Sequence, residues 1–129
     1  MLAARSHSGQ VDKGGKPYVL HPLRLMMQFE REEEMIVAVL HDVMEDSDVS
    51  YSDLLRAGFS VDVAEAVRCL TRGDSESYQD YVRRVAQNEI AARVKIADLR
   101  DNLNLSRIDE VDESDLARIK KYQLALKHL

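Results

Sequence analysis

The chain has 129 residues, 45% of them hydrophobic and 32% charged, which is typical of a single globular domain over 1–129 and excludes a disordered chain. Its net charge of −5 disfavours a general nucleic-acid binder, and no apolar run approaches the roughly 20 residues that cross a bilayer. The single Cys69 excludes an internal disulfide framework, so we expect a reduced, cytoplasmic protein whose sequence leaves a homo-oligomer open.

The spacing of apolar residues predicts helices along nearly the whole chain. The third of these helices begins with three glutamates, which complement the positive end of the helix dipole, and continues through Asp46. Because residues 35–40 are apolar almost all round, we expect this helix to be the buried, central one. The expected helices cover 1–8, 23–29, 32–46, 61–70, 75–88, 89–105 and 113–129, with a short one between a cap at Ser50 or Ser52 and Gly58.

Residues 10–22 are rich in glycine and proline and are expected to form a loop. We find no strand-type alternation of useful length, no internal repeat and no low-complexity tract. The sequence therefore predicts a compact all-α domain.

Four ionisable residues follow the apolar run of the third helix within six positions. Glu45 lies one helical turn after His41, and Asp46 lies one turn after Asp42, so each pair is expected to share a face of the third helix. Burying such groups is costly without a purpose. A solvated helix end is the alternative for Glu45 and Asp46.

Two further segments carry similar side chains. Lys95, Asp98 and Asn102 are spaced i, i+3 and i+7, which places them on one face of a largely apolar helix. In the loop, Gly14 and Gly15 permit close approach of the backbone to an anion, and His21 precedes a proline.

Imidazole and carboxylate groups from three segments make a mixed nitrogen and oxygen donor set. Such a set suits Mn, Fe, Co, Ni or Zn better than it suits calcium. With four protein ligands, a six-coordinate ion keeps positions open for water and a phosphoryl oxygen.

The order His21, His41-Asp42, Asp98 resembles the signature of the HD phosphohydrolase superfamily. The segments HSGQVDKGGKPYVLHPLRLM, VAVLHDVMEDSDVS and VKIADLRDNL are similar to the hydrolase domain of RelA/SpoT enzymes and their small single-domain relatives. The resemblance implies a helical HD fold and metal-dependent removal of the 3′-pyrophosphate of (p)ppGpp, giving GDP or GTP and pyrophosphate. It also implies a small nucleotide as partner and a divalent ion, commonly Mn²⁺, as cofactor.

Carried over by position, the resemblance implies that the metal ligands are His21, His41, Asp42 and Asp98. The pair Glu45 and Asp46 matches residues that orient or activate the attacking water. Lys13 and Asn102 match substrate contacts, and Lys16 is a further candidate for such a contact.

Two positions depart from the family pattern. Asp12 and Asn104 stand where basic residues are common, and both changes remove positive charge near the nucleotide. Two alternatives therefore stay open. One is the same chemistry on a nucleoside monophosphate or a 2′-phosphorylated dinucleotide, and the other is a metal-containing nucleotide sensor with little turnover.

Overall fold

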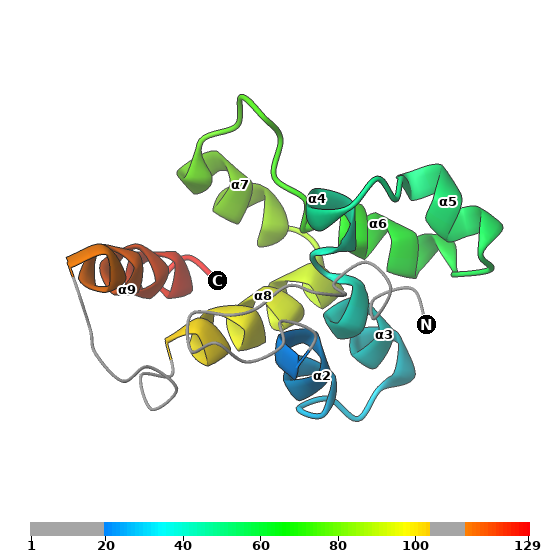
Figure 1. Ribbon diagram of the computed structural model, residues 1–129, viewed down its shortest axis with the longest axis horizontal. Helices are drawn as coiled ribbons and strands as arrows, with labels where there is room; N and C mark the ends of the chain where they lie inside the picture. Colours follow the sequence, from blue (N-terminus) through cyan, green and yellow to red (C-terminus); the bar gives the residue numbers. More distant parts are fainter. Residues whose placement is uncertain (1–19, 104–112) are drawn as a thin grey trace.

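A computed structural model describes residues 20–103 and 113–129 of the chain. Within these ranges the backbone forms helices and turns and no strand, which confirms the predicted all-α fold. The helix expected over 1–8 lies outside the described residues. In chain order (Figure 1) the helices are α2 (Leu20–Met26), α3 (Glu32–Leu40), α4 (Val43–Asp46), α5 (Tyr51–Arg56), α6 (Val61–Cys69), α7 (Tyr78–Val85), α8 (Glu89–Asn102) and α9 (Glu113–Leu126).

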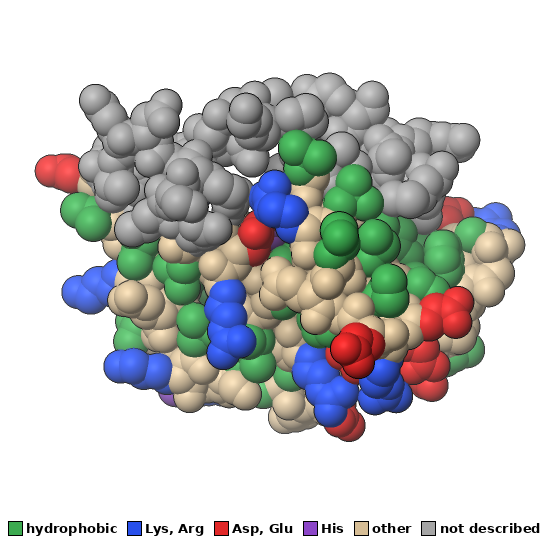
Figure 2. Space-filling view, turned by 90° about the horizontal axis from the view of Figure 1, so that it is seen from below, with side chains coloured by type: hydrophobic (Ala, Val, Ile, Leu, Met, Phe, Trp, Pro, Cys, Tyr) green, Lys and Arg blue, Asp and Glu red, His purple; other side chains and the backbone are tan. Residues whose placement is uncertain are grey.

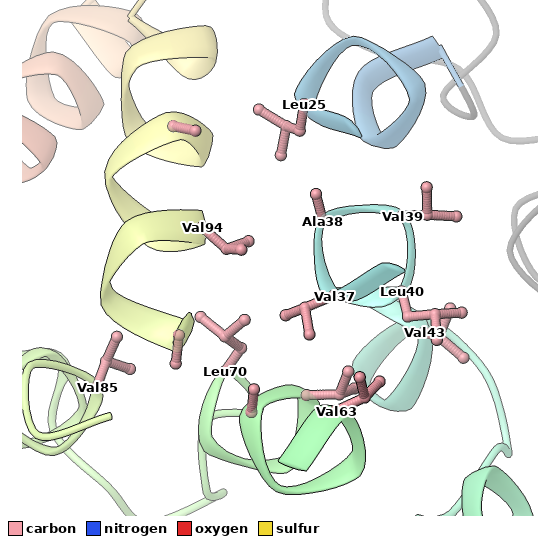
Figure 3. Close-up of a cluster of buried hydrophobic side chains, with 14 of the residues drawn as sticks. Leu25, Val37, Ala38, Val39, Leu40, Val43, Val63, Leu70, Val85 and Val94 are labelled. Atoms are coloured by element: carbon pink, nitrogen blue, oxygen red, sulfur yellow. The ribbon is translucent and has the colours of Figure 1, made fainter. Parts of the chain in front are cut away.

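Helix α3 forms the centre of the core, as its apolar run predicts. Its Val37 and Ala38 side chains are fully buried, and the helix packs against α2, α6 and α8. Figure 3 shows these side chains among Leu25 of α2, Val63 of α6 and Val94 of α8. Because three helices pack on α3, residues at its C-terminal end meet residues from distant parts of the chain.

Local signals explain where the short helix α5 begins and ends. The Ser50 side chain accepts the Asp53 N–H, and the Asp53 carboxylate accepts the Ser50 N–H, which is a capping box. After the helix, Gly58 adopts φ +97°, and the Phe59 N–H donates to the Leu54 carbonyl at 3.2 Å. This left-handed turn closes the helix where glycine was expected to stop it.

The third predicted helix is interrupted, and here the sequence interpretation was wrong. Helix α3 ends at Leu40, and Asp42 has φ −104° and ψ 3° before the short α4 begins. The His41 ring donates from Nδ1 to the Ala38 carbonyl at 2.7 Å. In a continuing helix this carbonyl would accept the backbone N–H of Asp42. The break therefore changes the direction of the chain between the histidine and the acidic pair.

Two helix boundaries also differ from the expectation. Helix α2 begins at Leu20, so His21 and Pro22 lie in its first turn, where proline is tolerated because its missing N–H has no helical partner. Helix α7 begins at Tyr78 and not at residue 75, because the Ser77 hydroxyl caps it by accepting the Asp80 N–H.

Helix α9 packs against α8 and lies near the left edge of the view in Figure 1. On the face seen in Figure 2, Lys and Arg side chains are interspersed with acidic and apolar ones. None of the helices in the described ranges has the length and apolar character that crossing a membrane requires.

Candidate functional site

Two histidines and one aspartate from three helices meet at a single buried point. His21 lies in the first turn of α2, His41 follows the last turn of α3, and Asp98 is on α8. Asp98 Oδ1 lies 2.8 Å from His21 Nε2 and 3.2 Å from His41 Nε2. All three residues are buried, so this polar cluster sits within the packing of α2, α3 and α8.

Asp42 extends the cluster toward solvent. Its Oδ2 lies 3.1 Å from His41 Nε2, and its side chain is 22% exposed. Ligand atoms of His21, His41 and Asp42 all lie within 4.8 Å of one another, which is a spacing that could hold a metal ion. The structure thus brings together the four predicted ligand residues, three of them by this spacing and Asp98 by its contacts with both imidazoles.

The hydrogen bonds of the two rings test whether a cation fits here. His41 Nδ1 donates to the Ala38 carbonyl, and His21 Nδ1 donates to Asp101 Oδ2 at 2.5 Å. Each Nε2 is therefore left facing Asp98, where it either shares a proton with the carboxylate or binds a cation. Neutral imidazole and carboxylate are ligands that transition metals accept together, so the residues fit the implied metal.

The charges in the cluster stabilise one another. Burial lowers the pKa of His21, but its hydrogen bonds to Asp101 and Asp98 outweigh burial and raise it. Burial also opposes the charged form of His41, yet the Asp42 and Asp98 carboxylates hold its pKa well above the usual value. The carboxylates therefore favour protonation of both imidazoles, and a metal ion would compete with those protons for the ring nitrogens.

Asp98 is the acidic centre of these contacts. Burial alone would raise the pKa of Asp98, but Lys95 and the two histidines hold it well below its usual range. The Lys95 ammonium donates to Oδ2 at 2.9 Å, and the Asn102 amide donates to Oδ1 at 3.1 Å. The predicted shared face of Lys95, Asp98 and Asn102 is confirmed, with both neighbours bound to Asp98.

Glu45 and Asp46 lie on α4 beside the cluster. Glu45 Oε1 accepts the backbone N–H of Arg72 at 2.7 Å, so the turn after α6 orients this carboxylate. Burial raises the pKa of Glu45, as do the nearby Asp42 and Asp46 charges, whereas the Arg72 N–H and Lys95 lower it. A carboxylate that lines a cavity and has a raised pKa is a candidate proton acceptor.

A cavity of about 290 Å³ joins these side chains. Its wall combines acidic residues near the histidine cluster with two lysines, two tyrosines and one amide from α7, α8 and α9. The lining residues are Asp42, Glu45, Asp46, Tyr78, Lys95, Asp98, Asn102, Lys121 and Tyr122. The cavity therefore offers cation ligands and anion contacts side by side.

The cavity wall includes Tyr78 and residues of α9 to which the sequence interpretation gave no role. The Lys121 ammonium lies 4.1 Å from the centre of the Tyr78 ring, and the buried Tyr78 hydroxyl has no hydrogen-bond partner in the described part of the chain. Burial and the positive charges of Arg72 and Lys95 lower the pKa of Lys121. An anion in this cavity would relieve that repulsion and offer the hydroxyl an acceptor.

Asp101 and Arg24 were also missed, although a signal for Asp101 exists. Asp98 and Asp101 are three residues apart, so they lie on the same face of α8. Arg24 stands three residues after His21 on α2 and binds Asp101 through Nε and Nη2, both at 3.1 Å. The predicted substrate contacts Lys13 and Lys16, and the departures Asp12 and Asn104, lie outside the described residues.

Comparisons with known proteins show what the whole chain is similar to. No family model matches the chain. The chain is 34% identical over 105 residues to a guanosine-3′,5′-bis(diphosphate) 3′-pyrophosphohydrolase of Vibrio cholerae, covering 78% of this chain and 14% of that protein. It is 28% identical over 142 residues to a GTP pyrophosphokinase of Myxococcus xanthus, covering 96% of this chain and 18% of that protein.

A solved structure agrees with the sequence matches. It is described as a metazoan ortholog of SpoT that hydrolyzes ppGpp, and it superposes with a TM-score of 0.74 at 29% identity, covering 98% of this chain and 78% of that one. The chain spans less than a fifth of the length of the Vibrio cholerae and Myxococcus xanthus relatives. Motif order, helical fold and these similarities together make the chain an HD-type, RelA/SpoT hydrolase-like protein.

Proposed function

We propose that this chain hydrolyses the 3′-pyrophosphate ester of (p)ppGpp in a metal-dependent reaction that releases GDP or GTP and pyrophosphate. One observation carries the proposal: the buried cluster of His21, His41 and Asp98 borders a cavity that also holds Glu45 and Lys95. The similarity to proteins named as (p)ppGpp 3′-pyrophosphohydrolases supports this substrate class.

The proposed metal ligands are His21, His41, Asp42 and Asp98. A divalent ion bound there would supply Lewis acidity toward water and a phosphoryl oxygen. The mixed donor set suits several transition metals, and the family resemblance favours Mn²⁺ among them. The residues that orient the two rings are already hydrogen-bonded, which supports a preformed site.

The acidic pair is proposed to act on the attacking water. Glu45 is held in the cavity wall by the Arg72 N–H, and its raised pKa suits a group that accepts a proton near neutral pH. Asp46 lines the same cavity and adds negative charge beside Glu45.

Positive charge for the substrate phosphates is proposed to come from Lys95, Lys121, Lys13 and Lys16. The first two line the cavity, and Asn102 offers an amide beside them. We propose a small-molecule nucleotide as the partner, since a cavity of about 290 Å³ is near the lower end of the range for ligand sites.

Two alternatives remain beside this proposal. The first is the same chemistry on another nucleotide phosphate, such as a nucleoside monophosphate or a 2′-phosphorylated dinucleotide. The second is a metal-containing nucleotide sensor with little turnover, which the loss of basic residues at Asp12 and Asn104 favours.

The test is a substrate panel with the purified chain and Mn²⁺. The panel contains ppGpp, pppGpp, a nucleoside monophosphate and a 2′-phosphorylated dinucleotide, with Asp98→Asn as the inactive control. We expect release of pyrophosphate from the two alarmones only. If the chain hydrolyses only another compound of the panel, that compound replaces (p)ppGpp as the proposed substrate. Binding of the alarmones without hydrolysis would support the sensor.

A charge reversal in the loop refines the substrate assignment. If the loop contacts the alarmone as the family resemblance implies, the Asp12 carboxylate would repel the phosphates by on the order of 1 kcal/mol. Asp12→Arg should lower KM for ppGpp with little change in kcat, because the new positive charge would stabilise the bound substrate and the transition state equally. The gain should shrink as salt rises. An unchanged KM at low salt, together with a silent Lys13→Ala, would show that this loop does not contact the alarmone.

A further inference from the structure

Three side chains form a continuous hydrogen-bonded chain behind one of the candidate ligands. The Arg24 guanidinium donates to both oxygens of Asp101 at 3.1 Å each, and Asp101 Oδ2 accepts from His21 Nδ1 at 2.5 Å. The Asp101 and His21 side chains are only 6% and 5% exposed. The chain ends at His21 Nε2, which faces Asp98.

This arrangement determines which nitrogen of His21 is available. An ionised carboxylate accepts hydrogen bonds and has no proton to donate. Asp101 therefore keeps the proton of His21 on Nδ1 and leaves the Nε2 lone pair available for a cation. A carboxylate partner also makes the imidazole a stronger electron donor toward a metal. His41 differs, because its Nδ1 donates to the neutral carbonyl of Ala38.

Arg24 keeps Asp101 in the form that this role needs. A bidentate guanidinium stabilises the ionised carboxylate and restricts its rotation, so both oxygens stay in place. Because Arg24 and His21 are both on α2 whereas Asp101 is on α8, the contact also fixes how the two helices meet.

We propose that Asp101, held by Arg24, is a positioning residue that sets the tautomer and orientation of His21 and thereby strengthens metal binding at the site. The proposal rests on the metal site in the proposed function. The two histidines differ in this respect. His21 Nδ1 donates to Asp101, which Arg24 binds, whereas His41 Nδ1 donates to the main-chain carbonyl of Ala38.

The first test measures Mn²⁺ affinity by calorimetric titration of the metal-free chain. Asp101→Asn keeps the shape of the side chain and removes its charge, and we expect affinity to fall by about 10- to 100-fold. The matched control is Glu34→Gln, since Glu34 is another buried carboxylate paired with an arginine, at 3.0 Å from Arg93 Nη1. This control should keep the wild-type affinity.

The second test reads the tautomer directly. Zn²⁺ replaces Mn²⁺ as a diamagnetic ion, and ¹⁵N-resolved NMR follows the Nδ1 protons of the two rings. We expect a slowly exchanging Nδ1 proton on His21 in the wild type, which is lost or exchanges rapidly in Asp101→Asn. The His41 Nδ1 proton should persist in both proteins, because its acceptor is the Ala38 carbonyl.

The outcomes separate this inference from the proposed function. Wild-type affinity in Asp101→Asn, or an equal loss in Glu34→Gln, would overturn the positioning role while leaving the metal site intact. A His21→Ala variant that binds Mn²⁺ as tightly as the wild type would instead refute the ligand set, and the positioning role would fall with it.

Discussion

Asp98→Asn is the perturbation that tests the metal centre most directly. The substitution preserves the shape of the side chain but removes the negative charge that lies 2.8 Å and 3.2 Å from the two imidazole Nε2 atoms. It also leaves the Lys95 ammonium, now 2.9 Å from Oδ2, without its carboxylate. A metal ion in this cluster would therefore lose one anionic ligand and meet an uncompensated positive charge.

The size of the effect follows from simple electrostatics. At an effective dielectric of about 20, two unit charges about 4 Å apart interact by about 4 kcal/mol, which corresponds to nearly a thousandfold in affinity. Metal at 100 times the wild-type Kd stabilises the folded chain by about 2.7 kcal/mol. After a thousandfold loss of affinity, the same metal concentration stabilises the variant by less than about 0.1 kcal/mol.

The assay is thermal unfolding of chelator-treated protein with and without Mn²⁺. For a chain of this length each kcal/mol shifts Tm by roughly 4 °C, so we expect a metal-induced rise of about 10 °C in the wild type and less than about 1 °C in Asp98→Asn. His128→Ala, which removes an exposed histidine, should keep the full rise. A rise of wild-type size in Asp98→Asn would refute the reasoning.

Three further expectations concern catalysis, pH and packing. Glu45→Gln combined with Asp46→Asn should retain metal by calorimetry but lower kcat by roughly a hundredfold or more, and unchanged turnover would reduce the pair to a solvated helix end. The Arg84 hydrogen bonds lower the pKa of Glu76 from 4.5 to about 2, so their stabilising effect is present above pH 4.5 and is lost as pH falls toward 2. The Tm of Glu76→Gln should lack this part of the acid dependence, and parallel Tm–pH curves would contradict it. Leu54 is fully buried, so Leu54→Ala should cost about 2–5 kcal/mol in urea unfolding at an unchanged m-value, and a cost below about 1 kcal/mol would show that the site collapses around the deletion.

Much of the local structure was predictable because its causes act over a few residues. The sequence predicted a cap at Ser50 or Ser52 and a stop at Gly58, and the structure places the cap at Ser50 and a positive φ at Gly58, because both features depend on neighbours within one turn. The apolar run of α3 likewise predicted a central helix, since a helix that is apolar on all sides is stable only when others surround it.

The break between α3 and α4 could not be read from the same local rules. Residues 35–46 have no glycine or proline to stop a helix, and the interruption comes with a side-chain bond from His41 to the Ala38 carbonyl. That bond is made where the ring is also held by Asp98, a residue 57 positions away. The position of His41 therefore depends on how α8 packs against α3.

The sequence by itself determined the helical class and the order of the four candidate ligands, because apolar periodicity and motif spacing are properties of short segments. Only the tertiary structure decided that Asp101, itself bound by Arg24, accepts a hydrogen bond from His21. It also decided that Lys121 of α9 lines the same cavity as Asp42 of the α3–α4 turn. Such contacts join residues nearly 80 positions apart, and the packing of whole helices, which no short segment encodes, brings them within hydrogen-bond distance.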